Sequence, residues 1–207
     1  MQFSLWLALV GAGTLISFTP GAGAIFTMSN SLNSGFRRSI WGILGQQVAL
    51  VIHILIVALG VGVLVSNSPV VFNVIRYAGA AYLVYLGIRQ FLRKPDLDED
   101  QVEEMKNEPA LSMFQRGVWV NLLNPKAIVF FLAFMPQFIR PDQPLVQQYV
   151  VLTATVLAID IMVMWFFFAL AARSFQRFTH DQRGQMILNR IFGCLFVLVG
   201  ILLAVIH

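Results

Sequence analysis

Charged residues and cysteines are scarce in this sequence of 207 residues. Asp, Glu, Lys and Arg make up 12% of the chain, whereas they make up about a quarter of a typical soluble domain. Apolar residues account for 58%. The single cysteine, Cys194, excludes a disulfide within the chain, and its place in an apolar run suggests packing. These scarcities exclude an ordinary soluble domain and favour an integral membrane protein.

Several sequence patterns of enzymes are also missing. The chain has no His-x-x-x-His pair, no Gly-x-Ser-x-Gly motif and no Walker lysine loop. A membrane-embedded enzyme and an ATP-driven pump are therefore disfavoured, and we expect no catalytic residue, no cofactor and no metal ion. A channel remains an alternative, because broken helices also line pores.

Stretches with few charges predict six membrane-spanning helices, each long enough for the roughly 20 residues that a bilayer core requires. The charge-free run 39–75 divides at the turn signal Ser66-Asn67-Ser68-Pro69. Six helices leave little chain outside the membrane, so we expect an all-α integral membrane protein with one domain over residues 1–207. The predicted spans cover residues 3–33, 39 to the turn, about 70–92, 113–138, 145–172 and 187–206.

The basic residues predict the orientation of these spans. Eleven of the 14 lysines and arginines lie in the connections between spans 1 and 2, 3 and 4, and 5 and 6, or at the span ends that adjoin them. Positive charge collects on the cytoplasmic side, so both termini are expected to face outward. Within the predicted cytoplasmic connector 93–112, Asp96–Glu108 holds seven acidic residues and one lysine, and we expect this segment to be flexible.

Two proline-centred breaks interrupt the first and fourth predicted spans. They read Phe18-Thr19-Pro20-Gly21-Ala22-Gly23 and Asn121-Leu122-Leu123-Asn124-Pro125-Lys126. Thr19 and Asn124 are residue types that favour the N-cap, and each precedes a proline, which is favoured at the first helical position. We therefore predict that helices 1 and 4 stop and restart inside the membrane. Paired interruptions in corresponding halves are the sequence signature of a transporter's binding site.

A second similarity relates the two halves of the chain. Arg76-x-x-Gly79-x-x-Tyr82 in the third span corresponds to Arg190-x-x-Gly193-x-x-Phe196 in the sixth. Three spans per half means that the halves run in opposite directions across the membrane. Together with the paired breaks, this predicts a 3+3 inverted repeat, with repeat 1 over about 1–92 and repeat 2 over about 113–207.

Three further stretches carry a family resemblance that covers nearly the whole chain. Ser17–Gly21, Val120–Lys126 and Pro136-Gln137-Phe138 resemble the hallmarks of the LysE/RhtB family of amino-acid exporters. Leu188–Gly193 is similar to the homoserine-type branch of that family. The family's frequent Pro-Gly-Pro reads Pro20-Gly21-Ala22 here, which places a lysine-type specificity in doubt.

The resemblance implies a multi-pass protein of the bacterial inner membrane that forms a homodimer. It implies efflux of small neutral amino acids or derivatives, such as homoserine, homoserine lactone or threonine, by proton antiport. The alternatives are a channel-like facilitator and an exporter of another amino acid such as leucine. In each case the partners are a small-molecule substrate and the lipid bilayer, without nucleic acid.

Three ionisable residues near the middle of predicted spans are the candidates for this chemistry. Asp160 is the only acidic residue there, and it can hold a substrate ammonium or the coupled proton, or serve as a neutral structural acid. Lys126 can bind a carboxylate or pair with Asp160. His53 can relay protons, although a lone histidine in an apolar helix is more often a packing residue.

Polar residues near the breaks complete the predicted site. Gln46, Gln47 and Asn30 can line the pathway or bond neighbouring helices, and Asp160 and His53 are the candidates for proton coupling. The predicted substrate-binding residues are Thr19, Pro20, Gly21, Asn121, Asn124, Pro125, Lys126 and Asp160.

Overall fold

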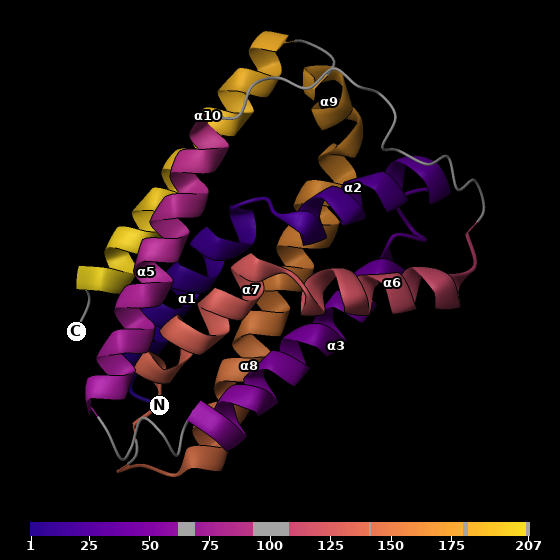
Figure 1. Cartoon of the computed structure of the whole chain (residues 1–207). Coiled ribbons are helices and arrows are strands. Elements are labelled where there is room, and N and C mark those ends of the chain that lie inside the picture. Colours follow the sequence, from indigo (N-terminus) through magenta and orange to yellow (C-terminus); the bar gives the residue numbers. More distant parts are fainter. Residues whose placement is uncertain (62–68, 93–107, 141, 180–181, 206–207) are drawn as a thin grey trace.

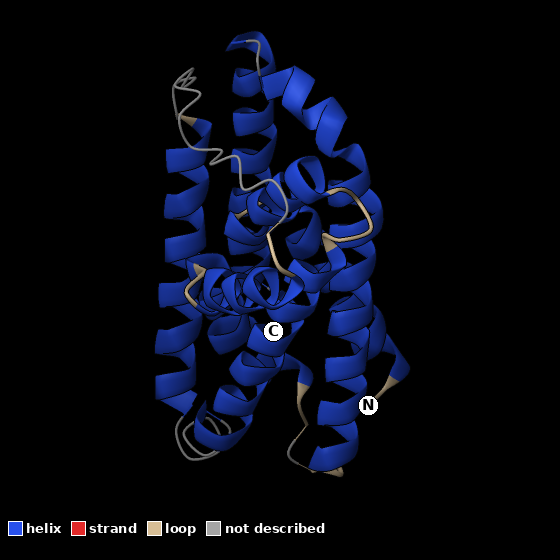
Figure 2. Ribbon diagram, turned by 90° about the vertical axis from the view of Figure 1, so that its right-hand side faces the viewer, coloured by secondary structure: helices blue, strands red, loops and turns tan. Residues whose placement is uncertain are grey.

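Helices make up all the regular structure of the described residues. The computed structural model describes residues 1–61, 69–92, 108–140, 142–179 and 182–205, and no strand occurs in these ranges (Figures 1 and 2). The predicted all-α class is thus confirmed. The elements are α1 (Phe3–Phe18), α2 (Ala22–Ser34), α3 (Ile40–Ile56) with the π-helical η1 (Val57–Val61), α5 (Pro69–Phe91), α6 (Ala110–Leu122), α7 (Pro125–Val129) with η3 (Phe130–Phe134) and η4 (Met135–Phe138), α8 (Leu145–Ile161) with η5 (Met162–Ala169), α9 (Leu170–Thr179) and α10 (Gln182–Val205).

Two of the predicted spans are broken where the prolines lie. α1 and α2 meet at an angle of 58°, and α6 meets the stretch Pro125–Phe138 at 52°. Both breaks are four residues or shorter. The predicted interruptions of the first and fourth spans are therefore present in the fold.

Among the described residues, three helical stretches are long and apolar enough to cross a membrane, or up to five if each bent pair crosses once. The three are Ile40–Gly60, Leu145–Ser174 and Arg183–Val205. α5 covers the third predicted span but is not among them, so the count of six spans stays a prediction. The fourth span differs in its boundary, because α6 begins at Ala110, inside the predicted connector 93–112. The rest of that connector, residues 93–107, lies outside the described residues.

Glycines bring two helix pairs into backbone contact. A side chain at Gly45 of α3 would collide with the Phe114 carbonyl of α6, and one at Gly117 of α6 would collide with the Gly42 carbonyl of α3. Gly87 of α5 and Gly193 of α10 face each other in the same way. The helices α5 and α10 run side by side (Figure 1). Close helix approach through small residues is typical of membrane helices.

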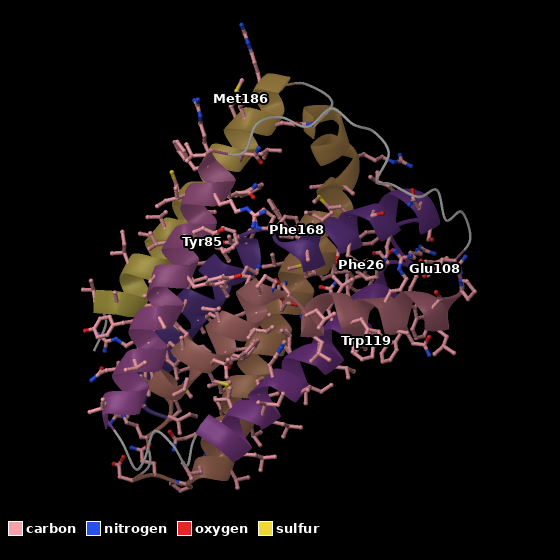
Figure 3. The ribbon with its side chains drawn as sticks, in the orientation of Figure 1. Phe26, Tyr85, Glu108, Trp119, Phe168 and Met186 are labelled. Carbon is pink, nitrogen blue, oxygen red and sulfur yellow. The ribbon has the colours of Figure 1, made fainter. Side chains whose placement is uncertain are left out.

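The interior and the surface of the described residues are both apolar. Phenylalanines of α7–η4, including Phe130 and Phe134, form the centre of the larger buried cluster. Large side chains such as Tyr85 and Trp119 lie exposed on α5 and α6, whereas Phe168 is buried (Figure 3). An apolar surface this extensive is expected of a protein that contacts lipid rather than water.

The two halves of the chain share a proline break and one π-helical segment at matching positions. Pro20 and Pro125 are 105 residues apart, and so are Val57 and Met162, where the π-helical segments η1 and η5 begin. η1 and η5 each follow an α-helix of 17 residues, α3 and α8. π-helical turns are rare and often occur at functional sites.

Candidate functional site

The two helix breaks contact each other through Lys126. Its Nζ donates hydrogen bonds to the backbone carbonyls of Ile16, at 3.0 Å, and Thr19, at 2.6 Å. These carbonyls end α1, where helix C-termini carry unpaired acceptors and partial negative charge. The Lys126 side chain is buried, and its aliphatic part lies against Gly21. Lys126 therefore caps α1 from the opposite half of the chain.

The restart of the second broken helix follows the predicted pattern. Asn124 is the N-cap of α7, Pro125 is its first residue, and the Asn124 side chain accepts a hydrogen bond from the Lys126 backbone N–H at 3.1 Å. The Asn124 amide also donates to the Asn121 side chain at 3.3 Å. The break thus fixes the backbone from which Lys126 projects.

The prediction that Thr19 is the N-cap of the first restart is wrong. Thr19 is the C-cap of α1, and its hydroxyl donates to the Leu15 carbonyl at 2.8 Å. The residue before a proline is pushed to extended backbone, and the restart is delayed to Ala22 with Gly21 as N-cap. The hydroxyl of Thr19 is engaged in the preceding turn and does not serve α2.

Asp160 lies at the end of α8, where α1 and α3 meet it. Ser17 Oγ donates to its Oδ1 at 3.2 Å, and Gln47 Nε2 donates to its Oδ2 at 2.7 Å. The side chain is buried. Asp160 and Lys126 form no direct ion pair of 4 Å or less, although both line one cavity. Each buried charge is instead stabilised by uncharged partners.

This cavity lies between the two breaks and the end of α8. It has a volume of about 40 Å³. Its apolar wall includes Leu50, Phe130 and Val156. The polar lining residues are Ser17, Gln46, Asn121, Asn124, Lys126 and Asp160.

Gln46 and Asn121 hold the cavity wall together. Gln46 Nε2 donates to the Gly23 carbonyl at 3.2 Å and to Thr27 Oγ1 at 2.9 Å. Asn121 Nδ2 donates to the Gln46 carbonyl at 3.1 Å. These bonds join α3 to α2 and α6 beside the site.

The remaining predicted residues do not line the cavity. His53 stacks on Phe131 with ring centroids 5.6 Å apart, and its Nδ1 is buried without a hydrogen bond. Asn30 is buried against Gly42, and its Nδ2 has no partner. Thr19, Pro20, Gly21, Gln47 and Pro125 are also absent from the cavity wall.

Sequence reasoning about single residues missed two hydroxyl groups of this site, those of Ser17 and Thr27. Ser17 bonds Asp160, and Thr27 bonds Gln46. Each is a small polar residue within two turns of the first break, which is the signal that could have selected them. Neither stands out by charge, so only the contacts show their place.

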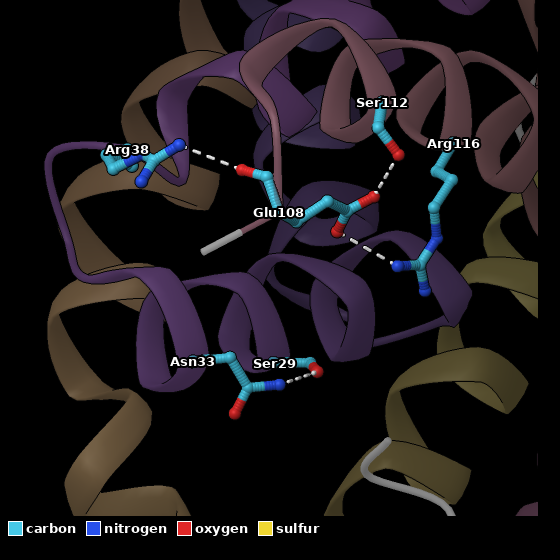
Figure 4. Close-up of polar contacts among 6 residues, drawn as sticks. All are labelled: Ser29, Asn33, Arg38, Glu108, Ser112 and Arg116. Atoms are coloured by element: carbon cyan, nitrogen blue, oxygen red, sulfur yellow. Dashed lines mark hydrogen bonds and ion pairs between the residues drawn. The ribbon is translucent and has the colours of Figure 1, made fainter. Parts of the chain in front are cut away.

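A second polar cluster lies where α6 begins. The Glu108 carboxylate accepts from Ser112 and pairs with Arg116 Nη1 at 3.0 Å, and its backbone carbonyl accepts from Arg38 at 2.8 Å (Figure 4). The expectation that Glu108 belongs to a flexible acidic segment is wrong, since its side chain is buried by these partners. The cluster ties the turn between α2 and α3 to α6.

Comparison with known proteins gives the family. A model of the LysE type translocator family matches residues 14–206. The chain belongs to the LysE family. The homoserine/homoserine lactone efflux protein of Salmonella typhimurium is 42% identical over 204 residues, which cover 99% of this chain and 98% of that protein.

Other relatives of this LysE family chain have less specific names. An uncharacterised membrane protein of Vibrio cholerae is 37% identical, over 99% of this chain and 98% of its own length. An uncharacterised membrane protein of Bacillus subtilis is 30% identical, over 94% and 96%. No solved structure matches this chain. Membership of a translocator family accords with transport rather than with enzymatic catalysis.

Proposed function

We propose that this chain exports small neutral amino acids or their derivatives, such as homoserine, homoserine lactone and threonine, in exchange for protons. The observation that carries the proposal is the cavity between the helix breaks. A buried carboxylate, Asp160, and a buried ammonium, Lys126, both line this cavity and form no ion pair with each other. Separated opposite charges in an apolar surrounding are complementary to an amino-acid zwitterion.

Each charged group of the cavity has room for one further bond. Lys126 Nζ carries three N–H donors and uses two on the carbonyls of α1, so one remains for a substrate carboxylate. Asp160 accepts two hydrogen bonds, and its oxygens have lone pairs left for an ammonium group. Gln46 and Asn121 also line the cavity, and their amides are suited to a substrate hydroxyl.

The size of the cavity supports alternating access. A volume of about 40 Å³ holds a few waters, since one water needs roughly 10–15 Å³ by this measure, but it is too small for an amino acid. Substrate entry therefore requires the helices around the breaks to move apart.

Coupling to protons follows from the single carboxylate. Asp160 can hold a proton or a substrate ammonium, and the two cations exclude each other. Loss of hydration favours the neutral form of a carboxyl, so the empty carrier takes up a proton before it returns. His53 is a weaker candidate for proton coupling, because it lies outside the cavity wall.

An inverted repeat is part of the same proposal. The matching 105-residue spacing of the prolines and of the π-helical segments supports two halves, over about 1–92 and 113–207, with six spans in all. Such halves place their interrupted helices around a shared central site. The mutual contact of the two breaks through Lys126 supports this arrangement.

Transport by a proton-coupled carrier has a direct test. We expect proteoliposomes loaded with labelled homoserine or threonine to release it faster when the outside is acidified, while labelled lysine stays inside. The rate should saturate with substrate and fall when an ionophore collapses the pH gradient. Release that grows without saturation and ignores the gradient would contradict the carrier and favour the channel alternative.

We also propose that both termini are periplasmic and that the connector 93–112 is cytoplasmic in the bacterial inner membrane. The exposed Cys194 is first replaced by Ser. An impermeant thiol reagent should then label Gln2→Cys in intact cells, and should label Glu103→Cys only after the cells are opened. Labelling of Glu103→Cys in intact cells would reverse the orientation.

A further inference from the structure

The Asp160 carboxylate has one uncharged donor on each oxygen. Gln47 on α3 supplies the shorter bond, from Nε2 to Oδ2 at 2.7 Å, and Ser17 on α1 supplies the longer one, at 3.2 Å. Lys126 directs two of its donors at the end of α1. The ionised form of Asp160 therefore depends on Gln47 more than on a neighbouring positive charge.

The other amide atom of Gln47 has no partner. Gln47 Oε1 is buried and accepts no hydrogen bond, although the side chain lies beside Asp160. A protonated carboxyl needs an acceptor for its O–H group, whereas an ionised one needs donors. A half-turn of the terminal amide brings Oε1 to the place of Nε2, since the two atoms are nearly equivalent in shape.

We propose that Gln47 is a positioning residue that serves both protonation states of Asp160. Its Nε2 donates to the ionised carboxylate, and after a half-turn its Oε1 accepts from the protonated carboxyl. In each state one amide atom is paired and the other is not, and the bond to the ionised carboxylate is the stronger of the two because one partner is charged. This inference rests on the proposed function, in which Asp160 exchanges a proton for the substrate.

The surroundings of Asp160 contain few other titratable groups. Within the described residues, α1 and η5, which pack against α8, contribute none, and α3 contributes His53. α7 contributes Lys126 across the cavity. The His53 imidazole stacks on Phe131 and makes no hydrogen bond to Asp160. Gln47 is thus the neighbour whose chemistry can follow the proton directly.

The test compares the pH profile of efflux for the unmodified protein, Gln47→Met and Gln47→Glu in proteoliposomes. Gln47→Met keeps the length but removes donor and acceptor, so the ionised form loses its shorter bond. We expect the midpoint of the efflux pH profile to move to higher pH by about one unit, which corresponds to a tenfold rise in the proton affinity of Asp160. Gln47→Glu should move it further in the same direction, because two adjacent carboxylates share a proton.

Gln90→Met is the matched control. Gln90 also uses its Nε2 in a side-chain bond, to Asn189 at 2.9 Å, but on α5 and α10. The efflux pH profile of Gln90→Met should have the same midpoint as that of the unmodified protein. Midpoints of Gln47→Met and Gln47→Glu that also stay unchanged would overturn the proposal.

Infrared titration distinguishes a failure of the role proposed for Gln47 from a failure of the proposed proton antiport. The protonated carboxyl band, identified by its loss in Asp160→Asn, reports proton binding even when a variant no longer transports. If this band titrates in Gln47→Met with the same midpoint pH as in the unmodified protein, the role proposed for Gln47 is overturned. A shifted band in a protein whose efflux ignores pH would support Gln47 and contradict proton antiport.

Discussion

Asp160→Asn should abolish pH-driven efflux and lower it to the level of protein-free liposomes. The substitution keeps the size of the side chain, and the amide can still accept a bond from Ser17 or Gln47. Insertion into the membrane is therefore expected to be normal. The amide cannot titrate and has no charge for a substrate ammonium, so both proton binding and substrate binding at this position are lost. Efflux under an imposed pH gradient, with protein amount measured in the same liposomes, checks this.

Asp142→Asn is the control for this prediction. Asp142 is exposed in the segment before α8, and the same change of carboxylate to amide there should leave efflux unchanged. If Asp160→Asn exported at the unmodified rate with the same pH dependence, the carboxylate would have a structural role. His53→Gln would then be the next variant for the coupling group.

Lys126→Gln should reduce efflux of homoserine more than efflux of homoserine lactone. Homoserine has a free carboxylate, whereas homoserine lactone is a cyclic ester without one. If Lys126 holds the carboxylate, the variant loses a charged hydrogen bond worth about 1.5–3 kcal/mol, and homoserine efflux falls by roughly tenfold to a hundredfold. Efflux of the lactone should change only a few-fold. Competition between the two labelled substrates in one preparation gives the ratio.

The lactone is also the internal control for the second role of Lys126. Because Lys126 caps α1, its loss can disturb the break itself, and that disturbance would reduce export of both substrates equally. An equal loss would contradict a carboxylate contact and leave only the capping role. Lys106→Gln, in the acidic segment, should leave both rates unchanged.

The sequence was most informative where charge or proline stood out in an apolar run. The all-α class, the two interrupted helices and the N-cap at Asn124 followed from such signals and agree with the structure. Asp160 and Lys126 were found because a buried charge has a large energetic cost and is seldom accidental. Weaker local signals were misleading. Thr19 was predicted as the N-cap of the restarted helix, but that helix begins at Ala22.

Residues that act through their neighbours give only a weak signal in the sequence, their closeness to a helix break or a charged run. Ser17 and Thr27 look like any small hydroxyl in a membrane helix, and Glu108 looks like one more charge in an acidic run. Their roles depend on side chains brought from distant helices, such as Asp160 for Ser17 and Arg38 for Glu108. No local pattern encodes a hydrogen bond between residues so far apart.

The sequence by itself determined that this chain is a helical membrane protein with two broken helices, a buried acid and a buried amine. Hydropathy and proline chemistry act locally, so a linear pattern records them. Tertiary structure alone decided that Lys126 caps α1 instead of pairing with Asp160, and that Gln47 is the closest partner of that acid. Such pairings follow from how the helices pack, which depends on close approach at glycines such as Gly45 and Gly117.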